Sequence, residues 1–203
     1  NTALKQLYYL NLKYRVLQQT TDGLIPFAIT FFGSSTVSAM SKSGPEASDA
    51  SFGNFGDRIS YVAQLIIARK FNENFSLVIQ PTYVRRNYVM FMDMNNLFAL
   101  GLGGRLKFSP SMALVVDYFL PFRKPESRDY YLEEKSFAFY HPLGVGLEIE
   151  TGGHVFNLSF TNSTALLETQ FIPSTGSSWS RGEFRWGFSI TRVFTLFQKK
   201  TPE

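Results

Sequence analysis

Cysteine is absent from this chain of 203 residues. The protein therefore has no disulfide framework, no thiolate metal ligands and no thiol nucleophile of its own. A lack of free thiols is compatible with an oxidising compartment such as the bacterial envelope, although it does not establish one. A chain of this length does not depend on disulfides to fold.

Long apolar runs are also missing, since no stretch of about 18 apolar residues could span a bilayer as a helix. In lipid, only helices and closed barrels satisfy every backbone polar group, so a membrane location requires a β-barrel. The chain begins at Asn1 without a charged, apolar leader, and we expect any signal peptide to have been removed or to lie outside these residues.

Histidine is scarce: only His141 and His154 occur. They flank a predicted strand and should lie at opposite ends of one hairpin, so they do not form one catalytic or metal site.

The glycine run 101–104 lies inside a predicted strand without a following helix or a Lys-Ser/Thr pair, which excludes a phosphate-binding loop. We therefore expect a protein that is not an enzyme, with no catalytic residues, no cofactor and no metal site.

Alternation of apolar and polar residues dominates what is present. In residues 97–108, Phe98, Leu102 and Leu106 share one parity, and Gly103 and Arg105 share the other. Period two predicts a strand with one apolar and one polar face. Nine segments follow this pattern, at about 6–18, 26–38, 57–70, 75–89, 97–108, 112–122, 143–150, 154–161 and 184–191, with ends uncertain by about 2–4 residues.

The connections between these segments alternate in length. Short ones are predicted at residues 20–25, 71–74, 109–111 and 151–153, and the others are 41–56, 90–96, 123–136 and 163–182. Outer-membrane barrels have tight periplasmic turns and extended extracellular loops. The residues on the apolar parity include many aromatic side chains, and these are also too bulky to fill a barrel interior. The chain is therefore interpreted as a single all-β domain over residues 1–203, an antiparallel transmembrane β-barrel with its apolar parity toward lipid.

Strand number gives a further expectation. The first strand would start at the long-loop end and the ninth would finish at the short-turn end, whereas bacterial single-chain barrels have an even strand number. We therefore expect an odd number of strands before residue 1, or strands supplied by another chain.

Six segments carry a resemblance to a known family: residues 57–61, 67–71, 86–89, 152–156, 161–163 and 184–192. On these segments the chain resembles the DUF5777 family of β-barrel proteins from Bacteroidota. The resemblance implies a signal peptide and about three more N-terminal strands, roughly twelve in all. The family has no established activity, so the resemblance implies a location and a fold without a mechanism.

The polar parity supplies the candidate functional residues. If the apolar parity faces lipid, eight charged residues project into the lumen: Lys13, Arg15, Arg105, Lys107, Asp117, Glu148, Glu150 and Arg185. Charges of both signs either line a water-filled path or neutralise one another in a filled interior. About twelve strands enclose a lumen of intermediate width, and the crowding of long side chains favours a narrow or plugged one.

Three functions remain open. The first is an outer-membrane barrel with a narrow or plugged polar lumen, with passage of small solutes as one option. The second is a scaffold or accessory subunit of a larger outer-membrane complex, and the third is a soluble carrier barrel for an apolar ligand. We expect long loops outside, the C-terminus in the periplasm, and outer-membrane lipid as partner, with other outer-membrane proteins reached through the loops or barrel wall.

Nucleic acid is not an expected partner. The net charge of +4 arises from scattered residues rather than a basic stripe. Among the long loops, residues 123–135 could dock a partner or fold over the barrel mouth. Residues 169–179 carry Phe171, Ile172, Pro173 and Trp179, apolar groups that an exposed loop would bury against something.

Overall fold

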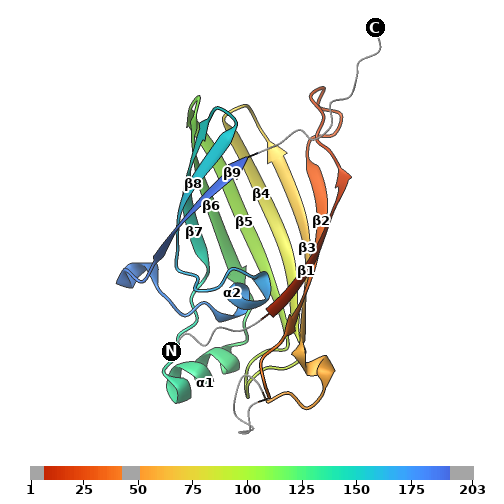
Figure 1. Cartoon of the computed structure of the whole chain (residues 1–203), viewed down its shortest axis with the longest axis vertical. Coiled ribbons are helices and arrows are strands. Elements are labelled where there is room, and N and C mark those ends of the chain that lie inside the picture. The colour runs from red at the N-terminus through yellow and green to blue at the C-terminus, as the bar shows by residue number, and fades with distance from the viewer. Residues whose placement is uncertain (1–6, 43–50, 193–203) are drawn as a thin grey trace.

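A computed structural model describes residues 7–42 and 51–192 of the chain, and Figure 1 shows a curled sheet of long strands. The strands are β1 (Leu7–Leu17), β2 (Ala28–Ser38), β3 (Ile59–Lys70), β4 (Phe75–Arg86), β5 (Asn96–Ser109), β6 (Met112–Pro121), β7 (Leu143–Thr151), β8 (His154–Thr161) and β9 (Arg185–Arg192). The helices are η1 (Phe55–Arg58), α1 (Pro125–Lys135), α2 (Glu168–Ser174) and η2 (Trp179–Arg181).

All nine predicted strands are confirmed, in one antiparallel sheet that follows chain order from β1 to β9. Their ends agree with the alternation to within three residues, the largest difference being that β4 ends at residue 86 rather than 89. The short turns gather at one end of the sheet, and α1, η1 and the other long connections gather at the opposite end (Figure 1). We call these the short-turn end and the long-loop end.

The sheet has two chemically different faces. One face packs against α2, through a buried cluster that joins Ile172 of α2 to sheet residues. The sheet members of this cluster are Val62, Val84, Leu97, Ala99 and Phe119. We call this the inner face, and the opposite one the outer face. Register then assigns every strand residue to a face, because side chains alternate along a strand.

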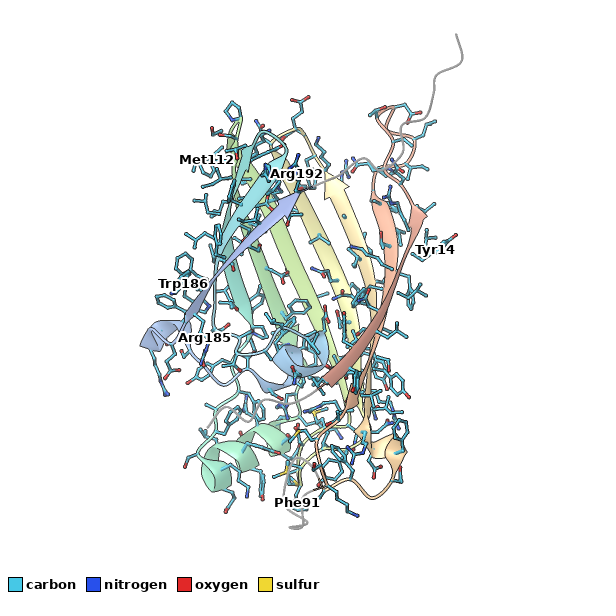
Figure 2. The ribbon with its side chains drawn as sticks, in the orientation of Figure 1. Tyr14, Phe91, Met112, Arg185, Trp186 and Arg192 are labelled. Atoms are coloured by element: carbon cyan, nitrogen blue, oxygen red, sulfur yellow. The ribbon has the colours of Figure 1, made fainter. Side chains whose placement is uncertain are left out.

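Large apolar side chains cover the outer face and are exposed. On β5, Phe98, Leu102 and Leu106 are 62%, 42% and 47% exposed, whereas Leu97 and Ala99 on the inner face are 1% and 3% exposed. Figure 2 shows Tyr14 and Trp186 pointing away from the sheet on opposite sides. A soluble protein would bury its apolar parity, so the reversed pattern indicates that lipid covers this surface.

The tight connections follow from local sequence. Thr151 pairs directly with His154, which leaves a two-residue turn at Gly152 and Gly153 with φ of +53° and +87°. Two consecutive left-handed residues define the turn that matches the twist of a hairpin, and glycine adopts that conformation without steric cost. None of the helices in the described ranges has the length and apolar character needed to cross a membrane.

The sheet is open among the described residues, since β1 pairs only with β2 and β9 only with β8. Both edge strands run in the same direction, because every pairing between them is antiparallel and both have odd numbers. Closing a fully antiparallel barrel between them would take an odd number of further strands. The expectation of strands before residue 1 stays a prediction.

Candidate functional site

Helix α2 lies within the curl of the sheet, against the inner face (Figure 1). Ile172 is 1% exposed, and Thr169 is 4% exposed with its hydroxyl 3.4 Å from that of Thr36 on β2. The connection between β8 and β9 therefore turns back into the sheet instead of extending away from it. The prediction that residues 169–179 bury their apolar groups is confirmed for Ile172 and Pro173.

The ends of this connection are fixed by hydrogen bonds. The hydroxyl of Thr175 donates to the Phe171 carbonyl at 2.8 Å and closes the last turn of α2. The side chain of Asn162 donates to the carbonyls of His141 and Ser177 at 3.0 and 2.9 Å. Asn162 is 2% exposed, so these bonds hold the loop against the start of β7 in a place that water does not reach.

Arg123 joins three separate segments at the long-loop end. Its guanidinium donates to Asp93 at 2.6 Å in the β4–β5 loop, to the Ser127 hydroxyl at 2.9 Å in α1, and to the Pro173 carbonyl at 2.7 Å in α2. It also lies 3.6 Å from the ring centroid of Phe139. A planar guanidinium can serve several acceptors at once and still stack on an aromatic ring, which Lys cannot.

Asp93 forms a second salt bridge, because the Arg86 guanidinium at the end of β4 donates to the other oxygen of the Asp93 carboxylate at 2.9 Å. Burial alone would raise the pKa of Asp93. The charges of Arg86 and Arg123, with hydrogen bonds from Arg123 and the Met94 amide, outweigh burial and hold that pKa below its ordinary value. The carboxylate therefore stays ionised and ties the β4–β5 loop to the connection that carries α2. We call Arg86, Asp93 and Arg123 the ionic latch.

The inner face is hollow toward the short-turn end. A cavity of about 420 Å³ lies over β3 to β6, bordered by Lys70, Ser76, Arg105 and Asp117. Gly103 also borders it, and a Cβ there would lie 2.6 Å from a methyl carbon of Val78. Glycine at this position lets β4 and β5 pack their inner faces closely.

The structure places the eight charged candidates on inner-face register positions. Arg105 and Glu148 reach across β6 and form a salt bridge at 2.6 Å, and Asp117 accepts a hydrogen bond from Gln80 at 3.4 Å. Arg185 donates to the Ser177 hydroxyl at 3.2 Å. The remaining candidates, which do not converge on one point, are Lys13, Arg15, Lys107 and Glu150.

The two histidines lie apart, as the sequence predicted. His154 begins β8 beside the turn at the short-turn end, whereas His141 precedes β7 at the long-loop end. The His141 Nδ1 lies 2.5 Å from the Tyr118 hydroxyl, on the outer face. Within residues 7–42 and 51–192, no cluster of three or more potential metal ligands occurs.

Sequence reasoning missed the ionic latch and both α-helices. The sequence predicts residues 123–135 as a long loop that docks a partner or folds over the barrel mouth, and nothing near Arg123 in the sequence indicates Asp93 or Pro173 as its partners. For α2, the apolar cluster 171–173 in a polar loop was the available sign, and it indicated burial but not a location inside the curl.

Comparison with known proteins agrees with this architecture. No curated protein and no solved structure matches the chain. A family model described as a membrane bound beta barrel domain matches residues 1–194. With nine antiparallel strands and an exposed apolar outer face in the described part of that range, the chain belongs to the DUF5777 family of membrane-bound β-barrel domains.

Proposed function

We propose that this protein is an integral outer-membrane barrel, without enzymatic activity, whose polar interior is narrowed by α2 and passes small solutes when α2 moves. The long loops lie outside the cell, and the short turns and C-terminus lie in the periplasm, as is usual for such barrels. The eight charged candidates line the interior. Residence in Bacteroidota is part of the same proposal.

The observation that supports a narrowed interior is the burial of Ile172 among Val84, Leu97 and Phe119 of the sheet. A loop that merely covered the barrel would leave its apolar residues half exposed. Instead α2 supplies the central apolar side chain of the inner-face cluster. The hollow region toward the short-turn end is the route by which solutes would reach it.

Planar-bilayer recording of the full-length protein tests this function. Ile172→Asp places a charge in the buried cluster and should release α2, so we expect larger or more frequent conductance steps than in the wild type. Leu166→Asp is the matched control, since Leu166 belongs to the same loop and is 94% exposed. Equal conductance in all three proteins, each correctly folded, would contradict the proposal.

One observation favours the second function, an accessory subunit of an outer-membrane complex. Phe91 is 75% exposed at the long-loop end, where Figure 2 labels it, and its ring contacts Tyr130 of α1. The next residue, Met92, has φ of +63°, an unfavourable backbone for a non-glycine residue. If a partner covers Phe91, Phe91→Ser should lower the native mass of the detergent-extracted assembly; an unchanged mass would count against this function.

The third function, a soluble carrier, requires the aromatic parity to face inward. The exposed aromatic residues of the outer face and membership of a membrane barrel family both oppose it. Heat-modifiable gel migration after detergent extraction would exclude it directly.

A further inference from the structure

Basic residues outnumber acidic ones on the inner face. The eight charged candidates include five basic and three acidic side chains, which are assigned by register. The same register adds two more basic residues, Lys70 opposite Ser76 and Arg86 opposite Ser60, and no acidic one. The excess of positive charge is therefore a property of the whole face.

Two of these basic residues, Lys70 and Arg105, border the hollow part of the face. Two cavities, of about 420 and 240 Å³, share Lys70, Ser76 and Arg105 on their borders. Lys70 and Arg105 therefore border both cavities.

Three acidic groups lie near these basic ones, and none of them forms a salt bridge with Lys70. The Glu148 carboxylate forms a salt bridge with Arg105 at 2.6 Å, and the Asp117 carboxylate accepts a hydrogen bond from Gln80. Glu73 borders the smaller cavity from the β3–β4 turn. Lys70 forms no salt bridge with any described residue, and neither does Lys107 farther along β5. Their ammonium groups are available to a solute.

Helix α2 and the side chains around the two cavities leave this part of the inner face unfilled. No residue of α2 borders either cavity, because α2 packs on the buried cluster instead. Gly103 and Ser76, which border the larger cavity, carry no side chain or a small one. A hollow bordered by ammonium and guanidinium groups accepts anions at those groups, because both donate hydrogen bonds to carboxylate, sulfonate and phosphate oxygens.

We propose that this hollow is a selectivity site for small anionic solutes, with Lys70 and Arg105 as the residues that contact them. The inference rests on the proposed function for its biological meaning, but it concerns the local potential and holds whether or not the barrel conducts. Rings of basic side chains select anions in pores by the same physics.

Charged thiol reagents measure that potential directly. The chain has no cysteine, so Ser76→Cys introduces one thiol between the two cavities. The full-length protein in lipid vesicles is treated with methanethiosulfonate reagents that carry either a sulfonate or a trimethylammonium group. Rates are normalised to those of Ser111→Cys, an exposed residue in the β5–β6 turn, and folding is checked by gel migration.

The anionic reagent should react at Ser76→Cys about threefold faster than the cationic one, and high salt should reduce the preference. Lys70→Glu should abolish or reverse it. Lys135→Glu, which changes net charge equally at the end of α1, should leave it unchanged.

A cationic preference, or a preference that Lys70→Glu does not alter, would overturn the inference. Reaction at Ser111→Cys but with neither reagent at Ser76→Cys would also overturn it, because the hollow would then be closed to solutes. An anionic preference in a protein that never conducts, even with Ile172→Asp, would contradict the proposed passage of solutes and leave the anion site standing.

Discussion

Arg123 and Asp93 form an ion pair at 2.6 Å with side chains only 7% and 9% exposed, between two connections that are distant in sequence. A buried pair of this kind is weak evidence for stability, because desolvation offsets much of the attraction. Its importance here is geometric. The same guanidinium also holds the Pro173 carbonyl, so the β4–β5 loop and α2 are positioned by one side chain.

Loss of Arg123 should loosen the long-loop end. Arg123→Ala leaves Asp93 with Arg86 as its one ionic partner and removes the donor to the Pro173 carbonyl. Breaking a buried ion pair costs up to about 3–5 kcal/mol. We expect a lower midpoint of heat-induced gel migration and a higher conductance. Arg128→Ala is the control, since the Arg128–Asp129 pair is 61% and 54% exposed and should contribute almost nothing. Equal effects of the two substitutions would disprove the special role of Arg123.

Acid should open the ionic latch. The pKa of Asp93 is lowered in the folded protein, so its contribution is fully present above the unfolded pKa of about 3.9 and is lost as pH falls through the lower folded value. The measurement is the difference in unfolding midpoint between wild type and Asp93→Asn. That difference should stay constant above about pH 5 and shrink below about pH 4. A difference that grows in acid would have the wrong sign for this account.

The two faces should tolerate charge differently. Leu102→Arg places a charge on the lipid-facing side of β5 and should cost about 2–4 kcal/mol near the middle of the bilayer. Ser76→Arg places the same side chain beside the cavities of the inner face and should be assembled nearly as well as wild type. Assembly is measured as the folded fraction on a gel without heating. Similar losses for both variants would reverse the assignment of faces.

Much of the fold was predictable, because β-strands in a membrane wall are specified by local alternation. Phe98, Leu102 and Leu106 fall on one parity with glycine and charged residues between them, and that pattern alone predicts the strand and its two faces. The turn at Gly152 and Gly153 was equally local. Residues 43–50 of the loop predicted at 41–56 lie outside the described residues.

The interior was much less predictable, because its contacts join residues far apart in the chain. Thr36 and Thr169 are separated by 133 positions, and Arg105 and Glu148 by 43. Alternation placed the charges on one face but could not show which of them pair. Helix α1 has a weak pattern, with most of its side chains charged, so its sequence resembles a solvated loop. Only tertiary contacts fix these parts.

The most direct test asks whether α2 occupies the interior of the barrel in the membrane. Thr36→Cys combined with Thr169→Cys places two thiols where the hydroxyls now lie 3.4 Å apart, and the chain offers no other cysteine. Oxidation of the full-length protein in intact outer membranes should form a disulfide that changes gel migration and is reversed by reductant. Thr36→Cys with Leu166→Cys, the exposed position in the same loop, should not cross-link. A disulfide in the first pair alone is the result expected here. Absence of cross-linking in a folded barrel, or equal cross-linking in both pairs, would contradict an interior position for α2.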